Sequence, residues 1–347
     1  MPNRICSQIV LVGKGSIGTR YLQYFSDKTE NIVILDPKFA HEEAVEQDMV
    51  KTIFRKNAQE LESSDIKPDS IAIIANWGPD HLETVVSLAS INVRKFVIEK
   101  PLTSSLNDST KLADLAERLK LSIVVNQGWD SISLAQRLNC LSEELKLGEP
   151  IGVLAYGGAR CMSTAGSHVI HLANKLFSTE VISVLGSMQS ARINPRNDSL
   201  AYFDGVLKVD FAKGKFLTLN YSNHSAVAGE VLILWRDAIG RLEEEHIEIL
   251  QLDPNREHAQ VITRYADARQ ERFKGKVPDY GYSTDNQFAN LLHALSEDNF
   301  DELSQFKDHL RSNQILLTAL ISSEAKRPLT IEEAIETTFA SKDFRIS

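Results

Sequence analysis

The sequence has little of what marks secreted, membrane-spanning or nucleic-acid-binding proteins. Its three cysteines are scattered along the chain and lack metal-binding or redox spacing. No apolar stretch approaches the roughly 20 residues that a bilayer-spanning helix needs. The net charge is −9 and no basic run occurs, which argues against nucleic acid as the main partner. Internal repeats and low-complexity segments are also lacking.

What the chain does have is the composition of an ordinary globular protein. Its 347 residues, 43% of them hydrophobic and 24% charged, are enough for two domains of usual size. The first strand pattern begins within a few residues of Met1, which leaves no room for a signal peptide. Together with the scattered cysteines, this predicts a cytoplasmic protein that has no membrane partner.

The most informative stretch runs from Ile9 to Gly18 and reads IVLVGKGSIG. Strand-forming residues lead into a Gly-x-Gly-x-x-Gly turn, and a helical pattern follows over residues 17–25. In such a turn the first glycine permits a tight bend, the second lets the backbone approach a pyrophosphate, and the third allows helix and strand to pack closely. The free N–H groups at the helix start then face the phosphates. The predicted cofactor contacts here are Gly13, Lys14, Gly15, Ser16, Ile17 and Gly18.

An acidic residue follows the glycine turn at an informative distance. The apolar run 32–35 ends at Asp36, eighteen residues after Gly18. A carboxylate near this spacing accepts hydrogen bonds from the adenine ribose hydroxyls and repels a 2′-phosphate. The pattern therefore predicts NAD as the cofactor. Lys38, which lies close to Asp36, keeps NADP open as an alternative, and a strand–helix–strand unit without a ligand is the other interpretation.

The order of elements predicts an α/β protein with two domains. Through residue 126 strand and helix patterns alternate, as a doubly wound parallel sheet requires. From residue 151 strand patterns follow one another and turns separate them, which is typical of a largely antiparallel sheet. We predict a Rossmann domain over residues 1–126 and an α+β domain with a large, mostly antiparallel open sheet over residues 127–347. A ligand is expected at the carboxyl ends of the parallel strands, facing the second domain.

The individual patterns give approximate boundaries. Strands are expected over residues 70–75, 94–98, 121–126, 151–156, 181–188, 203–211, 216–221 and 231–235. Helices are expected over residues 79–91, 106–119, 134–147, 167–176, 286–295, 303–322 and 331–337, and the polar stretch 41–48 is compatible with a helix.

Two segments carry residues that suit acid–base chemistry. Glu99-Lys100-Pro101 lies where a parallel strand would deliver a lysine next to bound nicotinamide, and that lysine would exchange a proton with an alcohol or carbonyl oxygen. Pro101 would fix the chain direction, in either the cis or the trans form. The plain alternative is a surface Glu/Lys pair before a turn.

The second segment is Thr164-Ala-Gly-Ser-His168-Val-Ile-His171. His168 and His171 would share one helix face, and a histidine near neutral pKa suits a hydrogen-bond donor or a proton relay. A metal is a weaker interpretation because no third ligand is evident, so we expect no metal. One core histidine and one exposed histidine is the plain alternative.

In this order, the pieces resemble the Gfo/Idh/MocA family (glucose–fructose oxidoreductase, inositol dehydrogenase and MocA). The glycine turn matches, Glu99-Lys100-Pro101 matches the family's Glu-Lys-Pro, whose lysine is catalytic, and His81 matches the histidine of its Thr-Pro-x-x-x-His loop. Gly166 and His168 match its Asp-x-Gly-x-His motif, whose histidine faces the substrate. The resemblance covers residues 5–175 by motif and the remainder by organisation.

Three positions depart from the family pattern. Asn76-Trp77 stands where Thr-Pro is usual, so Trp77 would pack against the nicotinamide ribose. Asn126 fits the family asparagine, but Gly128-Trp129-Asp130 stands where an arginine and an aromatic residue are common. Thr164 replaces the aspartate of Asp-x-Gly-x-His. Proton transfer would then depend on Lys100 and His168, with Thr164 as a hydroxyl relay. The alternative is that the chemistry is altered or lost.

The resemblance implies an NAD-dependent oxidoreductase. Such an enzyme moves a hydride between nicotinamide and a secondary hydroxyl or carbonyl group of a sugar, cyclitol or sugar nucleotide. It also implies a homodimer or homotetramer formed through the second sheet. The open alternatives are a non-catalytic NAD-binding sensor or assembly protein, and an NAD-using glycoside-cleaving or eliminating enzyme without net NADH release. Implied cofactor contacts are Asn76, Trp77, His81, Glu99, Lys100 and Asn126; expected substrate contacts are Lys100, Trp129, Arg160, Thr164, His168, His171, Tyr280 and Tyr282.

Overall fold

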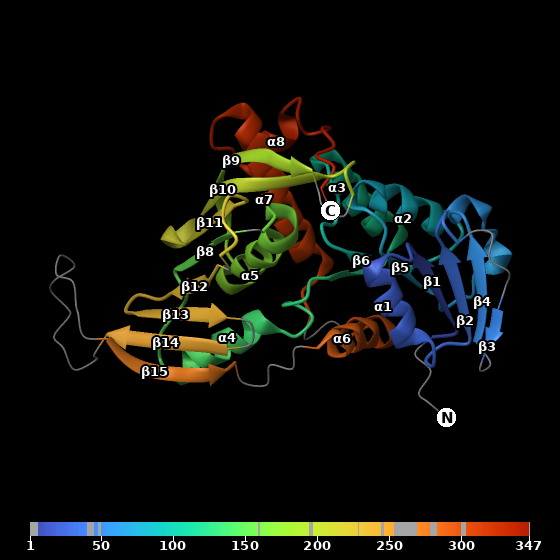
Figure 1. The fold of residues 1–347 in the computed structure, drawn as a ribbon, viewed down its shortest axis with the longest axis horizontal. Coiled ribbons are helices and arrows are strands. Elements are labelled where there is room, and N and C mark those ends of the chain that lie inside the picture. Colours follow the sequence, from blue (N-terminus) through green and yellow to red (C-terminus); the bar gives the residue numbers. More distant parts are fainter. Residues whose placement is uncertain are drawn as a thin grey trace.

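The computed structural model consists of two β-sheets that lie side by side, each covered by helices (Figure 1). It describes residues 6–39, 45–47, 50–158, 160–193, 197–227, 229–243, 246–252, 269–277, 283–299 and 303–346. A seven-stranded sheet is built from the N-terminal part of the chain, and an eight-stranded sheet from the middle part.

The first sheet is a Rossmann sheet. Its strand order is β3-β4-β2-β1-β5-β6-β7, and all neighbours run parallel except the edge pair of β3 and β4. The central strands are continuous apolar runs because both faces of the sheet are covered. The predicted parallel sheet is confirmed. The strands are β1 (Gln8–Val12), β2 (Asn31–Leu35), β3 (Val45–Gln47), β4 (Val50–Arg55), β5 (Ile71–Ile74), β6 (Lys95–Glu99) and β7 (Ser122–Asn126).

One expectation for this region was wrong. The stretch 41–48 was compatible with a helix, but Val45–Gln47 form β3, which pairs with β4 at the edge of the sheet. Pairing with a neighbouring strand outweighs the helical preference of a polar segment. The remaining residues of that stretch lie outside the described part of the chain.

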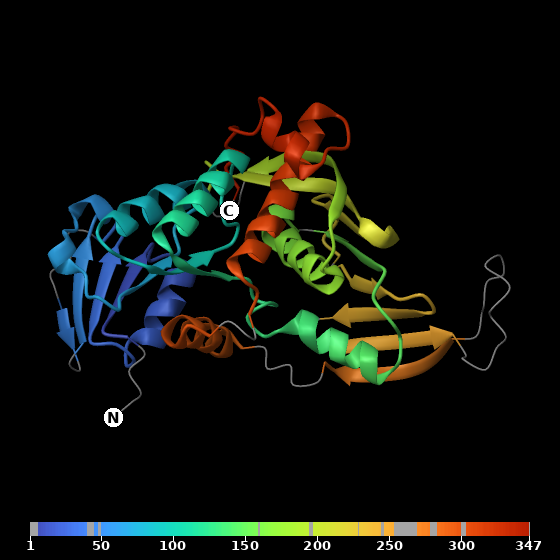
Figure 2. The same cartoon turned by 180° about the vertical axis from the view of Figure 1, so that it is seen from behind.

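Helices cover both faces of the first sheet. α2 (His81–Ser90) and α3 (Leu106–Leu119) pack on one face. α3 begins where the predicted pattern begins, because the Ser105 side chain accepts a hydrogen bond from the Asp108 N–H. The other face carries α1 (Ser16–Phe25) and α6 (Thr284–Glu297), which lie side by side in Figure 2.

The helix α6 comes from late in the sequence and yet belongs to the first core. Phe288 stacks on Tyr21 of α1 with ring centroids 3.9 Å apart, and three leucines of α6 are buried beside them. The division at residue 126 stays a prediction, and the core of the first sheet includes a segment from beyond it.

The second sheet has the order β15-β14-β13-β12-β8-β11-β10-β9. All neighbours are antiparallel except β8 and β11, so the predicted mostly antiparallel sheet is confirmed. The strands are β8 (Gly152–Gly158), β9 (Val181–Ile193), β10 (Ala201–Phe211), β11 (Phe216–Ser222), β12 (Val231–Leu234), β13 (Ala238–Glu243), β14 (His246–Leu252) and β15 (Arg269–Lys276).

One face of this sheet holds the main core, and the other is open. The core lies under α4 (Leu134–Glu144), α5 (Ser167–Phe177) and α7 (Phe306–Ala325). Four large apolar side chains of β8, β9 and β10 are instead exposed, alternating with buried neighbours: Tyr156, Ile182, Leu185 and Val206.

Short helical segments are Ala58–Glu60, Ser63–Asp65, Gly78–Asp80, Met162–Gly166, Ala212–Gly214 and α8 (Ile331–Glu336). Within the described ranges, none of the helices combines the length and the apolar character needed to cross a membrane.

Candidate active site

The glycine turn between β1 and α1 has the shape that a dinucleotide needs. Gly13 has φ +87°, and a Cβ there would lie 2.8 Å from the Ala75 carbonyl oxygen. At Gly18 a Cβ would lie 1.9 Å from the Gly13 carbonyl oxygen. A Cβ at Gly15 would instead meet no atom of the described residues within 4 Å, so open space lies in front of the start of α1. The turn therefore fits a pyrophosphate at this helix N-terminus.

Asp36 follows β2 and lies against the same turn. Its carboxylate accepts hydrogen bonds from the backbone N–H groups of Lys14, at 2.8 Å, and Lys38, at 2.9 Å. The ammonium group of Lys14 lies 4.1 Å from the centroid of the Phe39 ring. The carboxylate is thus held rigidly where a ribose attached to the pyrophosphate would reach, and each oxygen keeps a lone pair for a hydroxyl donor.

His81 fixes the loop that follows β5. It is 1% exposed, and its Nδ1 and Nε2 lie 3.2 Å from the carbonyl oxygens of Leu102 and Asn76. Burial lowers the pKa of His81. Because both ring nitrogens face backbone, the structure supports a bracing role between two loops and gives no support to the predicted cofactor contact. Trp77 stands at the rim of this loop, 39% exposed.

Glu99 and Lys100 lie at the carboxyl end of β6, between the ends of β5 and β7. The Glu99 carboxylate accepts hydrogen bonds from the Tyr21 hydroxyl, at 3.1 Å, and from Nδ2 of Asn126, at 2.6 Å. Burial raises the pKa of Glu99, and the charge of Lys100 partly offsets that rise. The peptide bond from Lys100 to Pro101 is cis. β6 thus delivers Lys100 to the edge of the sheet at which the sequence predicts the ligand.

His168 comes from the second domain and meets this edge. It lies in the first turn of α5, with its ring centroid 5.9 Å from that of Trp129. Its Nδ1 is buried and has no hydrogen-bond partner among the residues that the structure describes. Burial first, and then the positive charge of Lys100, lower the pKa of His168 to about 3. The imidazole is therefore neutral near pH 7, and its Nδ1 remains for a ligand.

This low pKa predicts an acid-sensitive fold. Below pH 6.5 an unfolded chain protonates His168 while the folded chain does not, so the free energy of unfolding falls as the pH falls toward 3. Between pH 6.5 and 5 this one group removes on the order of 1–2 kcal/mol. His168→Gln should lose less stability over that interval, as measured by urea unfolding at both pH values. Exposed His246→Gln should follow the wild type; equal losses in all three proteins would contradict the prediction.

Thr164 and Arg160 lie just before α5. The Thr164 hydroxyl is 3.5 Å from the Cys161 carbonyl oxygen, at the limit of a hydrogen bond, so it is weakly held by the protein. Burial raises the pKa of Tyr221 to about 12. Arg160 lies beside the Tyr221 hydroxyl, and its positive charge partly offsets that rise. The predicted contacts Tyr280 and Tyr282 lie outside the described residues.

His171 belongs to a buried cluster that sequence reasoning missed. The cluster, called here the Asp130 cluster, comprises Asp130, His171, Ser304, His309 and Ser312. Oδ1 of Asp130 lies 3.1 Å from Nε2 of His171, and Oδ2 lies 3.3 Å from Nε2 of His309. The Ser304 hydroxyl and backbone N–H also donate to this carboxylate. The pKa of Asp130 is held well below its usual range by the two histidines, against the opposing effect of burial.

The Asp130 cluster resembles a hydrogen-bonded network more than a metal centre. Although two histidines and a carboxylate lie within ligand distance of one another, the imidazole rings are stacked at 4.4 Å and 4° from parallel. Parallel rings do not aim both lone pairs at one ion, and four donors already occupy the carboxylate. Nδ1 of His171 contacts the Ser312 hydroxyl at 3.0 Å. Both of its nitrogens are thus engaged, which does not support the predicted contact between His171 and substrate.

No local sequence pattern indicates the Asp130 cluster. Asp130 and His309 are far apart in sequence, and only the packing of α7 against α5 brings them together. The two histidines of α5 have no third metal ligand near them in sequence, because the second imidazole of the cluster comes from α7.

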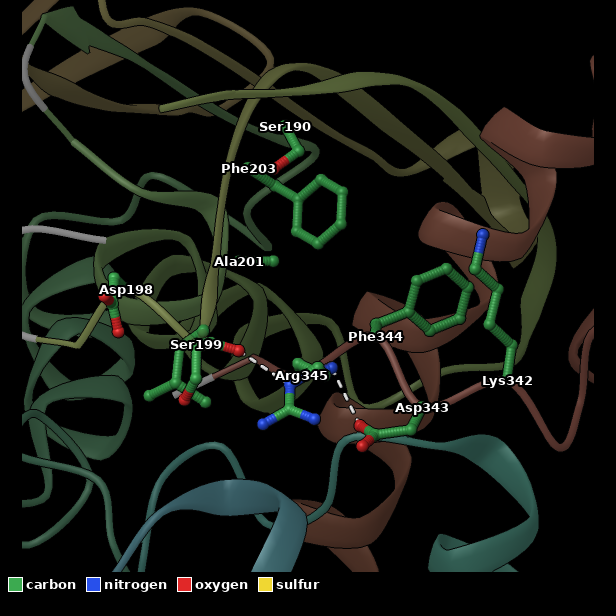
Figure 3. A pocket seen from close by; sticks show the side chains of 10 residues that line it. Ser190, Asp198, Ser199, Ala201, Phe203, Lys342, Asp343, Phe344 and Arg345 are labelled. Carbon is green, nitrogen blue, oxygen red and sulfur yellow. Dashed lines mark hydrogen bonds between the residues drawn. The ribbon is translucent and has the colours of Figure 1, made fainter. Parts of the chain in front are cut away.

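A separate cavity of about 490 Å³ lies between β9, β10 and the C-terminal segment (Figure 3). Phe203 and Phe344 meet edge to face on its wall, and Nε of Arg345 donates to the Ser199 carbonyl oxygen at 2.6 Å. The C-terminal segment also reaches the first domain, where a Cβ at Gly78 would lie 2.6 Å from the Ile346 carbonyl oxygen. None of the predicted site residues that the structure describes lines this cavity.

The glycine turn, the carboxylate after β2 and a Rossmann sheet next to an open antiparallel sheet define a two-domain dinucleotide-binding protein. Residues 7–127 match the sequence model of the Gfo/Idh/MocA family, described as an oxidoreductase family with an NAD-binding Rossmann fold. The first domain is therefore the NAD-binding Rossmann domain of this oxidoreductase family.

Solved structures share the fold over more than nine-tenths of the chain. An NAD-binding protein from Listeria innocua superposes with a TM-score of 0.70 at 16% identity, over 95% of this chain and 99% of its own. A UDP-N-acetylglucosamine 3-dehydrogenase from Acidithiobacillus ferrooxidans gives 0.63 at 13%, over 92% and 98%. Levoglucosan dehydrogenase in complex with NADH and levoglucosan gives 0.68 at 13%, over 93% and 99%. No curated protein matches the sequence.

Proposed function

We propose that this protein is an NAD-dependent dehydrogenase or reductase that acts on a secondary hydroxyl or carbonyl group of a sugar, cyclitol or sugar nucleotide. The proposal rests on one observation: Lys100 and His168 come from different domains and meet at the carboxyl edge of the first sheet. The same sheet carries the glycine turn that fits a dinucleotide. Solved relatives named for acting on a sugar nucleotide and on levoglucosan support this substrate class.

The residues at the carboxyl edge of the first sheet have different roles in the proposed reaction. Lys100 takes the proton of the substrate hydroxyl during oxidation and returns it during reduction. Neutral His168 binds the same oxygen or its neighbour through Nδ1, which is buried and finds no hydrogen-bond partner within the described part of the chain. Thr164, whose hydroxyl is weakly held, supplies a third polar contact where the family has an aspartate.

Other residues hold the cofactor in place. The turn from Gly13 to Gly18 receives the pyrophosphate, and Asp36 binds the ribose hydroxyls and disfavours a 2′-phosphate. Oδ1 of Asn126 and Oδ1 of Asn76 are buried and have no hydrogen-bond partner among the described residues, which suits them to polar groups of the cofactor. When bound, NAD supplies the hydride acceptor, while the protein supplies position and charge. The exposed apolar face of the second sheet, which includes Tyr156 and Ile182, is proposed as the contact in a homodimer or homotetramer.

The test is NADH formation from NAD across free sugars, cyclitols, sugar acids and nucleotide sugars, with NADP in parallel. Turnover with NAD is expected. A clear preference for NADP would overturn the assignment that rests on Asp36. NAD binding without turnover on any substrate would favour the second candidate, an NAD-binding sensor, which the replacement of the family aspartate by Thr164 motivates.

A further inference from the structure

A small cavity connects Lys100 with the Asp130 cluster. It measures about 20 Å³, and its walls include Lys100, Gln127, His171, His309, Ser312 and Asn313. A single buried water needs roughly 10–15 Å³ and two to four polar partners. Both conditions are met, so one water fits between the lysine at the sheet edge and the two histidines behind it.

The contacts of the two histidines distinguish their roles. Nδ1 of His171 faces the Ser312 hydroxyl, and its Nε2 faces Asp130 and Ser304 at 3.1 Å. Nε2 of His309 contacts the Asp130 carboxylate. Among the described residues, no hydrogen-bond partner is seen for Nδ1 of His309. The carboxylate accepts only, so Nε2 of His309 carries the hydrogen and Nδ1 is the basic nitrogen. An aspartate that fixes a histidine in this way also stabilises its charged form.

We propose that His309 exchanges protons with Lys100 through one water in this cavity; the proposal rests on the proposed function. When substrate is oxidised, its hydroxyl O–H bond breaks and the proton goes to neutral Lys100, while the proposed hydride transfer accounts for the electron pair. Lys100 then gives a proton to the water, and the water gives one of its own to Nδ1 of His309. The water is unchanged, and His309 ends as a cation beside Asp130. Reduction runs the same steps in reverse.

The surrounding charges favour a single mobile proton. Besides Asp130 and Lys100, the titratable groups near His309 among the described residues are His171 and the ion pair of Lys175 with Asp308, 3.0 Å apart. Burial and the neighbouring His309 lower the pKa of His171. His171 therefore stays neutral when His309 is charged, and it serves as a positioning residue that braces the carboxylate.

The first test is kinetic and compares His309→Gln with Ser304→Ala. The glutamine keeps a donor toward Asp130 and cannot titrate, so kcat should fall about tenfold. We expect one ionisation to disappear from the pH profile of kcat and the solvent isotope effect to rise. Ser304→Ala removes one hydroxyl donor from Asp130 but keeps both imidazoles, so the shape of its pH profile should match the wild type. A slower His309→Gln enzyme with an unchanged profile and isotope effect would overturn the relay.

The second test needs no turnover, so that it separates the relay from the proposed function. In NMR spectra recorded at one pH, Lys100→Met should move the ring signals of His309, because the water in the cavity loses the lysine as its partner. Exposed His246 on β14 serves as the reference whose signals should not move. Unchanged His309 signals overturn the link to Lys100. Shifted signals in a protein without dehydrogenase activity support the link and count against the proposed reaction instead.

Discussion

Lys100→Met should lower kcat/KM for NAD-dependent oxidation about 1,000-fold while NAD still binds. Methionine has nearly the length of lysine but cannot accept the hydroxyl proton. Among the described residues of the proposed site no other titratable group takes its place, because the low pKa of His168 makes that imidazole a poor base. Initial rates of NADH formation measure the first effect, and quenching of tryptophan fluorescence by NAD measures the second.

The matched control for this variant is Lys111→Met. Lys111 is an exposed lysine of α3 that makes a surface ion pair with Asp108, so its removal should leave the rate unchanged. Retention of more than about a tenth of the wild-type rate by Lys100→Met would exclude Lys100 as the general acid–base group. Equal loss in both variants would point to a general effect of removing positive charge.

Gly18→Ala and Gly15→Ala should both abolish tight NAD binding, but for different reasons that stability measurements separate. A methyl group at Gly18 would overlap the Gly13 carbonyl oxygen, so the turn must open, and the free energy of unfolding should fall by about 2 kcal/mol. A methyl group at Gly15 meets no atom in the described ranges of the chain, so the melting temperature should stay within a few degrees of the wild type.

Calorimetric titration with NAD and thermal unfolding without it distinguish the two variants. Loss of NAD affinity in Gly15→Ala, at unchanged stability, would show that the open space in front of α1 is where the cofactor lies. If Gly15→Ala instead binds NAD as the wild type does, the pyrophosphate does not approach this turn, and the fit derived from the glycines is wrong.

Much of the fold could be predicted because local signals and packing agree there. The helix Leu106–Leu119 has the predicted bounds: Ser105 caps its start and Lys120 ends it in the left-handed region. The buried apolar runs of β1 and β2 likewise appear where predicted. In such segments each residue prefers the structure that the fold requires.

The predictions failed where distant segments decide the structure. The strands β13, β14 and β15 were not predicted from their sequences; β13 and β14 alternate apolar and polar residues over short lengths and are held by antiparallel partners. In the site, Lys100 and His168 were found by motif, since each follows a recognisable pattern. His309 had no such pattern, because its partner Asp130 lies on a loop after β7.

The position of α6 limits where this chain can be divided into fragments that fold. Phe288, Leu291, Leu292 and Leu295 fill the first core from a segment that follows the second sheet in sequence. A fragment ending at residue 126 would leave that apolar face without one of its two helices, and we expect it to aggregate or to remain unfolded. Exchange of whole cofactor domains between relatives must therefore transfer two separate pieces of chain, or redesign the surface that α6 covers.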